Sequence, residues 1–130
     1  MKKPEAMNNT ERALAFIRAW DARDIDAILA AVSDDIFYHN IPMEPMTGKA
    51  ALQHFAGPFL AGAERVEWEV HHIAETSEGA VLTERTDGFY MKGGKTISVR
   101  VMGTFEFDET GRISKWRDYF DLAEFQSQMG

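Results

Sequence analysis

The chain has 130 residues, of which 45% are hydrophobic and 27% charged, a composition typical of one soluble globular domain. Its formal net charge of -7 disfavours phosphate backbones and anionic membrane surfaces, so we expect neither nucleic acid nor a membrane as a partner. The absence of cysteine excludes disulfides and thiolate chemistry, and it is compatible with the reducing cytoplasm, where we expect the protein to reside.

The amino-terminal half of the chain shows helical periodicity. No apolar run follows the first two lysines, so we expect no secretory signal there, and residues 1–8 are expected to form a flexible tail. Asn9 and Thr10 are typical caps for a first helix, and Asp24 for a second, shorter one. A third helix is expected to begin at Thr47, and Pro58 should kink or end it. Apolar residues at helical spacing support the first and third helices: Ala13, Phe16, Ile17, Trp20, Leu52, Phe55, Phe59 and Leu60.

After Gly62 the periodicity changes to two, which is typical of strands with one buried face. Including a short strand before the third helix, strands are expected over residues 35–40, 65–76, 80–91, 96–107 and 112–121. Helices followed by a long antiparallel meander indicate a single α+β domain over residues 1–130. We expect a cone-shaped, curved, mixed but mainly antiparallel sheet, with three to four helices closing an internal pocket.

Two of the expected strands carry charge on a face that is otherwise apolar. In "KWRDYFDL", strand alternation places Asp118 between Trp116 and Phe120. In "VLTERTDGFY", Arg85 and Asp87 share one face. A buried carboxylate is costly when it is unpaired, but the planar fork of arginine can hold two carboxylates. If both faces line one pocket, the three charges converge there; a structural salt bridge or exposure on the outer face of the sheet would also explain them.

A phenol and a carboxamide lie near the end of the first strand. Tyr38 and Asn40 are two residues apart in "FYHNIP", so both side chains can face the interior. Together they offer hydrogen-bond donors and acceptors, which suit the positioning of a water molecule. Alternatively, Asn40 serves the turn before Pro42, and Tyr38 is a core residue.

Three motifs, taken in order, resemble the limonene-1,2-epoxide hydrolase family. They are "YHNIP" (38–42), "TERTD" (83–87) and "WRDYFDLAEF" (116–125), and the similarity spans roughly the last two-thirds of the chain. The family belongs to the nuclear-transport-factor-two-like, or SnoaL-like, superfamily of cone-shaped α+β folds. The resemblance implies an enzyme that needs no cofactor and adds water directly to an epoxide, giving a vicinal diol without a covalent intermediate. It also implies a homodimer formed through the outer face of the sheet.

The resemblance assigns a role to each of the five polar positions. It implies Asp118 as the general base and Asp87 as the general acid, with Arg85 bridging them. Tyr38 and Asn40 would hold the attacking water together with Asp118. Two close carboxyls can share this work only if their protonation states differ, so we expect the aspartates to titrate as a unit.

The walls of the pocket should be apolar and should suit a lipophilic, uncharged epoxide of terpene or cycloalkene size. Candidate substrate-binding residues are Trp116, Phe120, Phe89, Val99, Val101 and, from the loop after the first strand, Met43 or Met46. No metal site is expected, because His39 and His54 lie in unrelated elements. His71 and His72 are adjacent on a strand, so we expect the first to be exposed and the second to face the interior.

Two other functions remain open at this point. The first is an isomerase or cyclase similar to ketosteroid isomerases or polyketide cyclases, which remove a carbon-bound proton beside a carbonyl. Such an enzyme would not need Arg85 between two acids. The second is a ligand-binding module without catalysis, whose buried charges are structural.

Overall fold

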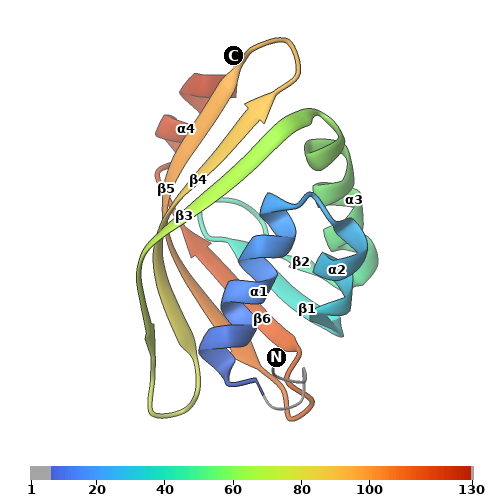
Figure 1. Ribbon diagram of the computed structural model, residues 1–130, viewed down its shortest axis with the longest axis vertical. Helices are drawn as coiled ribbons and strands as arrows, with labels where there is room; N and C mark the ends of the chain where they lie inside the picture. Colours follow the sequence, from blue (N-terminus) through green and yellow to red (C-terminus); the bar gives the residue numbers. More distant parts are fainter. Residues whose placement is uncertain (1–6, 130) are drawn as a thin grey trace.

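A computed structural model describes residues 7–129 and shows an α+β architecture in two layers (Figure 1). The elements follow one another in the order α1 (Asn9–Asp21), α2 (Ile25–Ala30), β1 (Val32–Asn40), β2 (Met46–Thr47), α3 (Lys49–Ala61), β3 (Ala63–Glu75), β4 (Val81–Met91), β5 (Thr96–Phe107), β6 (Ile113–Tyr119) and α4 (Leu122–Met129). The expected fold class is therefore confirmed: a curved, unclosed, mainly antiparallel sheet is combined with four helices in the part of the chain that the structure describes.

The strand order of the sheet is β2-β1-β6-β5-β4-β3. All neighbouring strands are antiparallel except β1 and β6, which pair in parallel. This pairing joins two segments from opposite ends of the chain. It places Tyr38 level with Trp116 and Asn40 level with Asp118. The first strand and the last strand therefore bring their polar residues to the same place in the sheet.

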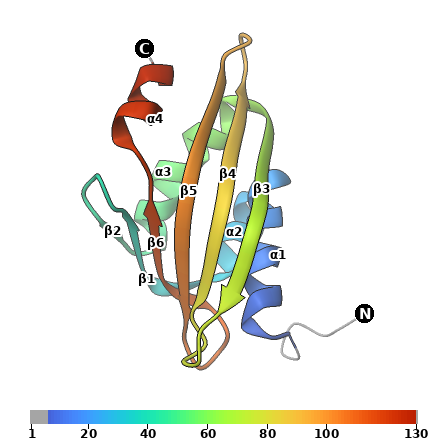
Figure 2. The ribbon, with the colours of Figure 1, turned by 90° about the vertical axis from the view of Figure 1, so that its left-hand side faces the viewer.

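Helices α1, α2 and α3 lie together on the concave face of the sheet, as both ribbon views show (Figures 1 and 2). Asn8, and not the expected Asn9 or Thr10, caps α1, and its side chain accepts the Glu11 N–H at 2.8 Å. Residues 1–6 of the expected tail lie outside the described residues. Asp24 caps α2, as predicted. Helix α3 begins at Lys49 and not at the expected Thr47, and it continues past Pro58 to Ala61, so it does not end at that proline.

The carboxyl-terminal helix α4 was not identified from the sequence. It lies beside β5, past the point where β6 ends (Figure 2). The Gln128 amide accepts the backbone N–H of Ser98 at 2.7 Å and donates to its carbonyl at 2.8 Å. Arg100 donates to Glu124 at 2.9 Å. These bonds occupy the edge of β5 that β6 leaves free, and no residue of α4 is itself buried.

The expected inner and outer positions of β3 hold only for its first half. The register with β4 shifts between Val70 and His72, which is a β-bulge. A bulge adds one residue to one strand and reverses the side-chain alternation beyond it. The side chain of His72 is 84% exposed, so the expectation that it faces the interior is wrong.

No helix within residues 7–129 has both the length and the apolar character needed to cross a membrane.

Candidate active site

The three charged residues meet on the concave side of the sheet. Arg85, Asp87 and Asp118 are 1%, 5% and 3% exposed. Arg85 donates from Nε and Nη2 to the two carboxyl oxygens of Asp87, at 3.0 and 2.9 Å. The same Nη2 donates to Oδ2 of Asp118 at 3.0 Å. Their placement on the outer face of the sheet, which the sequence left open, is therefore excluded.

A second layer of contacts holds this group in place. Nη1 of Arg85 donates to the Thr83 hydroxyl at 2.9 Å, and that hydroxyl donates to the Gly103 carbonyl at 3.1 Å. The indole N–H of Trp116 donates to Oδ1 of Asp118 at 2.8 Å. A side chain at Gly103 would occupy the space of Arg85 and Asp118, because its Cβ would lie well under 3.0 Å from an atom of each. Gly103 is therefore required for the triad to form.

The triad of Asp87, Arg85 and Asp118 contains two carboxyl groups and only one guanidinium. When both carboxyls are ionised the group has a net negative charge, and burial makes that charge costly. Burial raises the pKa of Asp87 to about 6, against the lowering effect of Arg85, and the neighbouring Asp118 adds to the rise. Burial alone would lower the pKa of Arg85, but the two carboxylates outweigh it and raise that pKa above its ordinary value. Arg85 thus remains a cation. Asp87 is the carboxyl group that burial predisposes to hold a proton.

Tyr38 and Asn40 lie beside the triad. The Tyr38 hydroxyl donates to Oδ1 of Asn40 at 3.0 Å, and both residues are buried. Burial raises the pKa of Tyr38 well above 10, so its hydroxyl remains a donor. The main chain of Asn40 also serves the turn, because its carbonyl accepts the N–H of Met43 at 2.7 Å. The two interpretations of Asn40 are therefore compatible: its backbone forms the turn, and its side chain lines the cavity.

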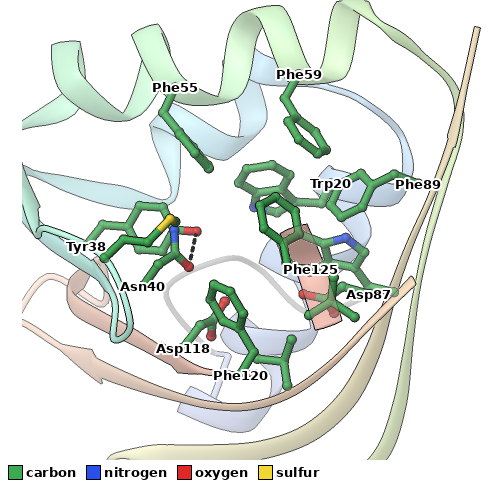
Figure 3. A pocket seen from close by; sticks show the side chains of 14 residues that line it. Trp20, Tyr38, Asn40, Phe55, Phe59, Asp87, Phe89, Asp118, Phe120 and Phe125 are labelled. Atoms are coloured by element: carbon green, nitrogen blue, oxygen red, sulfur yellow. Dashed lines mark hydrogen bonds between the residues drawn. The ribbon is translucent and has the colours of Figure 1, made fainter. Parts of the chain in front are cut away.

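Asp87, Asp118, Tyr38 and Asn40 line an apolar cavity of about 60 Å³, whereas Arg85 is not part of its lining (Figure 3). Of the expected wall residues, Phe89, Val99, Val101, Phe120 and Met43 line it. Five further aromatic residues also line it, which were not predicted from the sequence: Trp20, Phe55, Phe59, Trp68 and Phe125. The spacing of Phe55 and Phe59, four residues apart on α3, is the signal that places both on one helix face.

Trp116 does not line the cavity, contrary to the expectation from strand alternation. It is fully buried, stacks on Tyr38 at 4.0 Å and meets Phe16 edge-on at 5.0 Å. It shares a face of β6 with Asp118, as predicted. The cavity, however, reaches Asp118 near the end of that strand and does not reach Trp116, whose contribution is the hydrogen bond to Asp118.

The histidines lie apart from this site. The ring of His39 bonds to the carbonyl of Met43 at 2.9 Å, and that of His71 bonds to the Thr86 hydroxyl at 2.8 Å. Over residues 7–129, no three His, Asp or Glu side chains are grouped so that they could hold a metal ion.

Comparison with known proteins gives the chain a family. Residues 7–130 match the model of the limonene-1,2-epoxide hydrolase catalytic domain. The epoxide hydrolase EphG of Mycobacterium tuberculosis is 37% identical over 110 residues, which cover 85% of this chain and 71% of EphG.

Solved structures agree with this result. An epoxide hydrolase from M. tuberculosis, described as similar to limonene-1,2-epoxide hydrolase, superposes with a TM-score of 0.74 at 33% identity, covering 92% of this chain and 87% of its own. A Shewanella denitrificans structure described as a SnoaL-like polyketide cyclase gives 0.82 at 18% identity, covering 93% and 96%, and shares the fold. The chain belongs to the limonene-1,2-epoxide hydrolase family.

Proposed function

We propose that the protein is an epoxide hydrolase that needs no cofactor and adds water directly to a lipophilic epoxide to give a vicinal diol. The observation that carries the proposal is the buried group of Asp87, Arg85 and Asp118, whose two carboxyl residues line an apolar cavity. Membership of the family and the similarity to the epoxide hydrolase EphG support the reaction class.

Different carboxyl groups remove the proton from the attacking water and donate a proton to the departing epoxide oxygen. Asp118 accepts a proton from a water molecule that Tyr38 and Asn40 help to hold, and the water oxygen attacks one epoxide carbon. As that C–O bond of the ring breaks, Asp87 gives its proton to the departing oxygen. Arg85 stabilises whichever carboxyl group is ionised. The step consumes the proton of Asp87 and places one on Asp118, so the proton must return to Asp87 before the next turnover.

The apolar cavity suits a lipophilic, uncharged substrate, as expected for a terpene or cycloalkene epoxide. Its volume of about 60 Å³ is well below the roughly 300 Å³ at which small-molecule pockets usually begin. Wall side chains must therefore move when such a ligand binds. Phe125 belongs to α4, which has no buried residue, so it is one of the wall residues that can yield.

We also propose a homodimer formed through the outer face of the sheet, as the family resemblance implies. Met102 and Tyr119 are register partners on β5 and β6 and are 54% and 47% exposed. Large apolar side chains that are adjacent and exposed are typical of protein interfaces. Light scattering of the wild-type protein and of Met102→Lys tests this point. A wild-type protein that is monomeric at all concentrations would refute it.

The function is tested by incubating the protein with limonene oxide and cyclohexene oxide and measuring diol. In a single turnover with enzyme in excess and ¹⁸O-labelled water, the label should appear in the diol. Label in a protein carboxyl group would instead indicate an ester intermediate. No diol from several apolar epoxides, together with ready isomerisation of a β,γ-unsaturated ketone, would refute the proposal in favour of an isomerase. Ligand binding without any turnover would favour a binding module.

A further inference from the structure

Two tryptophans of the cavity wall carry hydrogen-bond donors that no described residue uses. Trp20 comes from α1 and Trp68 from β3, and their rings stack at 4.7 Å with 17° between the planes. Both line the cavity and are only 2% and 6% exposed. Neither indole N–H has an acceptor within residues 7–129. A buried donor that lacks an acceptor is destabilising, so the pair requires a physical explanation.

In contrast, the third tryptophan of the chain, Trp116, is buried with its indole N–H hydrogen-bonded. The indole N–H of Trp116 donates to Asp118 at 2.8 Å, and Trp116 itself does not line the cavity. The buried hydroxyls of Ser33 and Thr104 also lack a partner, but a hydroxyl can rotate toward a new one. An indole N–H is fixed by its ring. The two unpaired indoles are thus rigid donors, and both tryptophans belong to the lining of the cavity.

The position of these donors relates them to the proposed chemistry. Trp68 is the register partner of Asp87 across β3 and β4, and its ring lies 5.0 Å from the Arg85 guanidinium carbon. Figure 3 shows Trp20 above the cavity, with its nitrogen on the edge of the ring that faces the interior. Among the described lining residues, Trp20 and Trp68 are the only side chains with a polar N–H or O–H group outside the proposed catalytic set. The rest of the lining is Phe, Val and Met.

We propose that Trp20 and Trp68 form a binding site for a second oxygen atom of the substrate. The preferred substrates are then oxygenated epoxides, which carry a carbonyl, ether or hydroxyl oxygen in addition to the epoxide ring. This inference rests on the proposed function and defines its substrate class. The epoxide oxygen receives the proton of Asp87, so we assign the indoles to a different oxygen atom of the substrate. A carbonyl or ether oxygen has lone pairs and can accept from an indole N–H.

A pure hydrocarbon epoxide would leave both donors unpaired in the complex. A site that hydrogen-bonds a substrate group discriminates against an analogue that lacks this group, because its own buried polar groups then lose their partner. The site therefore favours the oxygenated member of a matched pair of ligands. One neutral hydrogen bond corresponds to a preference of roughly three- to tenfold.

NMR of the protein with ¹⁵N-labelled tryptophan tests the site without any reaction. The chain has 3 tryptophans, so the spectrum contains three indole N–H signals, which Trp20→Phe and Trp68→Phe assign. The probes are cyclohexanone and methylenecyclohexane, which differ only in C=O against C=CH₂. We expect the ketone to move the signal of Trp20 or Trp68, or both, downfield more than the hydrocarbon does. The signal of Trp116 should not distinguish the two probes, because its donor is already occupied.

Kinetics test the consequence for turnover. The substrates are cyclohexene oxide and its analogue with one ring CH₂ distant from the epoxide replaced by oxygen. We expect wild-type kcat/KM to favour the ether analogue by roughly three- to tenfold, and Trp20→Phe or Trp68→Phe to reduce that ratio. Phe59→Leu is the matched control, because it removes part of an aromatic wall without removing a donor. It should change kcat/KM for both substrates alike and preserve the ratio.

The outcomes separate this inference from the proposed function. Equal shifts of the Trp20 and Trp68 signals with the two probes, or an unchanged substrate ratio in both tryptophan variants, would overturn the donor site even if diol forms. A ketone-specific shift without hydrolysis of any epoxide would support the donor site and refute the epoxide hydrolase. A hydrocarbon epoxide that shifts the indole signals of Asp118→Asn as far as its ether analogue does would overturn the assignment of a second oxygen.

Discussion

Replacing Gly103 with alanine should disrupt the triad without removing any of its charges. Gly103 lies on β5, opposite Thr83 on β4 and Asp118 on β6. Its φ is not positive, so alanine can adopt the same backbone conformation, and space is the only obstacle. The new methyl group would meet Nη1 of Arg85 and Oδ1 of Asp118 at well under 3.0 Å. Both atoms are buried and hydrogen-bonded, so neither can swing into solvent.

The size of the effect follows from this geometry. Arg85 and Asp118 must each retreat by more than about half an ångström, which breaks or lengthens the 3.0 Å bond between them. A misplacement of about 1 Å in catalytic groups lowers the rate by on the order of 100-fold, which we expect for kcat/KM. Overpacking a buried site typically costs about 1–3 kcal/mol, which we expect for the free energy of unfolding.

Two assays on two variants test this prediction. Initial rates of diol formation and urea unfolding should be measured for Gly103→Ala and for the control Gly57→Ala. A Cβ at Gly57, in helix α3, would meet nothing within 4 Å. The control should keep wild-type activity and gain about 0.5–1 kcal/mol in stability from its higher helix propensity. A Gly103→Ala variant with wild-type kcat/KM and stability would refute the argument that the triad depends on the missing side chain.

Three further predictions concern the proton transfer and the wall. Asp118→Asn should lower diol formation by at least about 100-fold, since general-base catalysis is lost, while calorimetry still detects diol binding; retained activity would exclude Asp118 as the base. Because Asp87 works only when protonated and its pKa is raised to about 6, kcat/KM should fall roughly tenfold per pH unit above that value; a rate that is level to pH 8 would contradict its role as the acid. Phe125→Ala should enlarge the cavity of about 60 Å³ and lower KM for limonene oxide more than for cyclohexene oxide, and equal changes would show that Phe125 does not limit its size.

Strand alternation was sufficient to place the charges, because the inner faces of β4 and β6 keep their period through Arg85, Asp87 and Asp118. What alternation does not give is the distance between these two strands, since β5 lies between them. Strands spaced about 4.8 Å apart would normally separate such residues by an intervening side chain. Gly103 removes that side chain. An isolated glycine within a strand pattern often marks such a close approach, and this is the signal by which the sequence could have identified it.

The remaining errors come from contacts between segments that are distant in the sequence. The parallel pairing of β1 with β6 brings Asn40 beside Asp118, and no local pattern specifies it. The cavity wall needs Phe125 from α4, whose position is set by bonds to the free edge of β5. The bulge before His72 could not be predicted from the sequence either. One extra residue reverses which face of the strand each side chain occupies, although the sequence pattern continues unchanged. Local periodicity therefore predicted the faces of the elements, but not how the elements meet.

The proton content of the site links its electrostatics to its chemistry. With both carboxyls ionised, Asp87, Asp118 and Arg85 carry a net charge of about -1 in a buried site, whereas one added proton makes the group neutral. Burial penalises net charge, and the rise in the pKa of Asp87 to about 6 expresses that penalty. Direct attack by water needs one carboxyl that accepts a proton and one that donates it, which is the singly protonated state. A reaction that only removes and returns a carbon-bound proton needs a single carboxyl, and it would leave unexplained why Arg85 holds two.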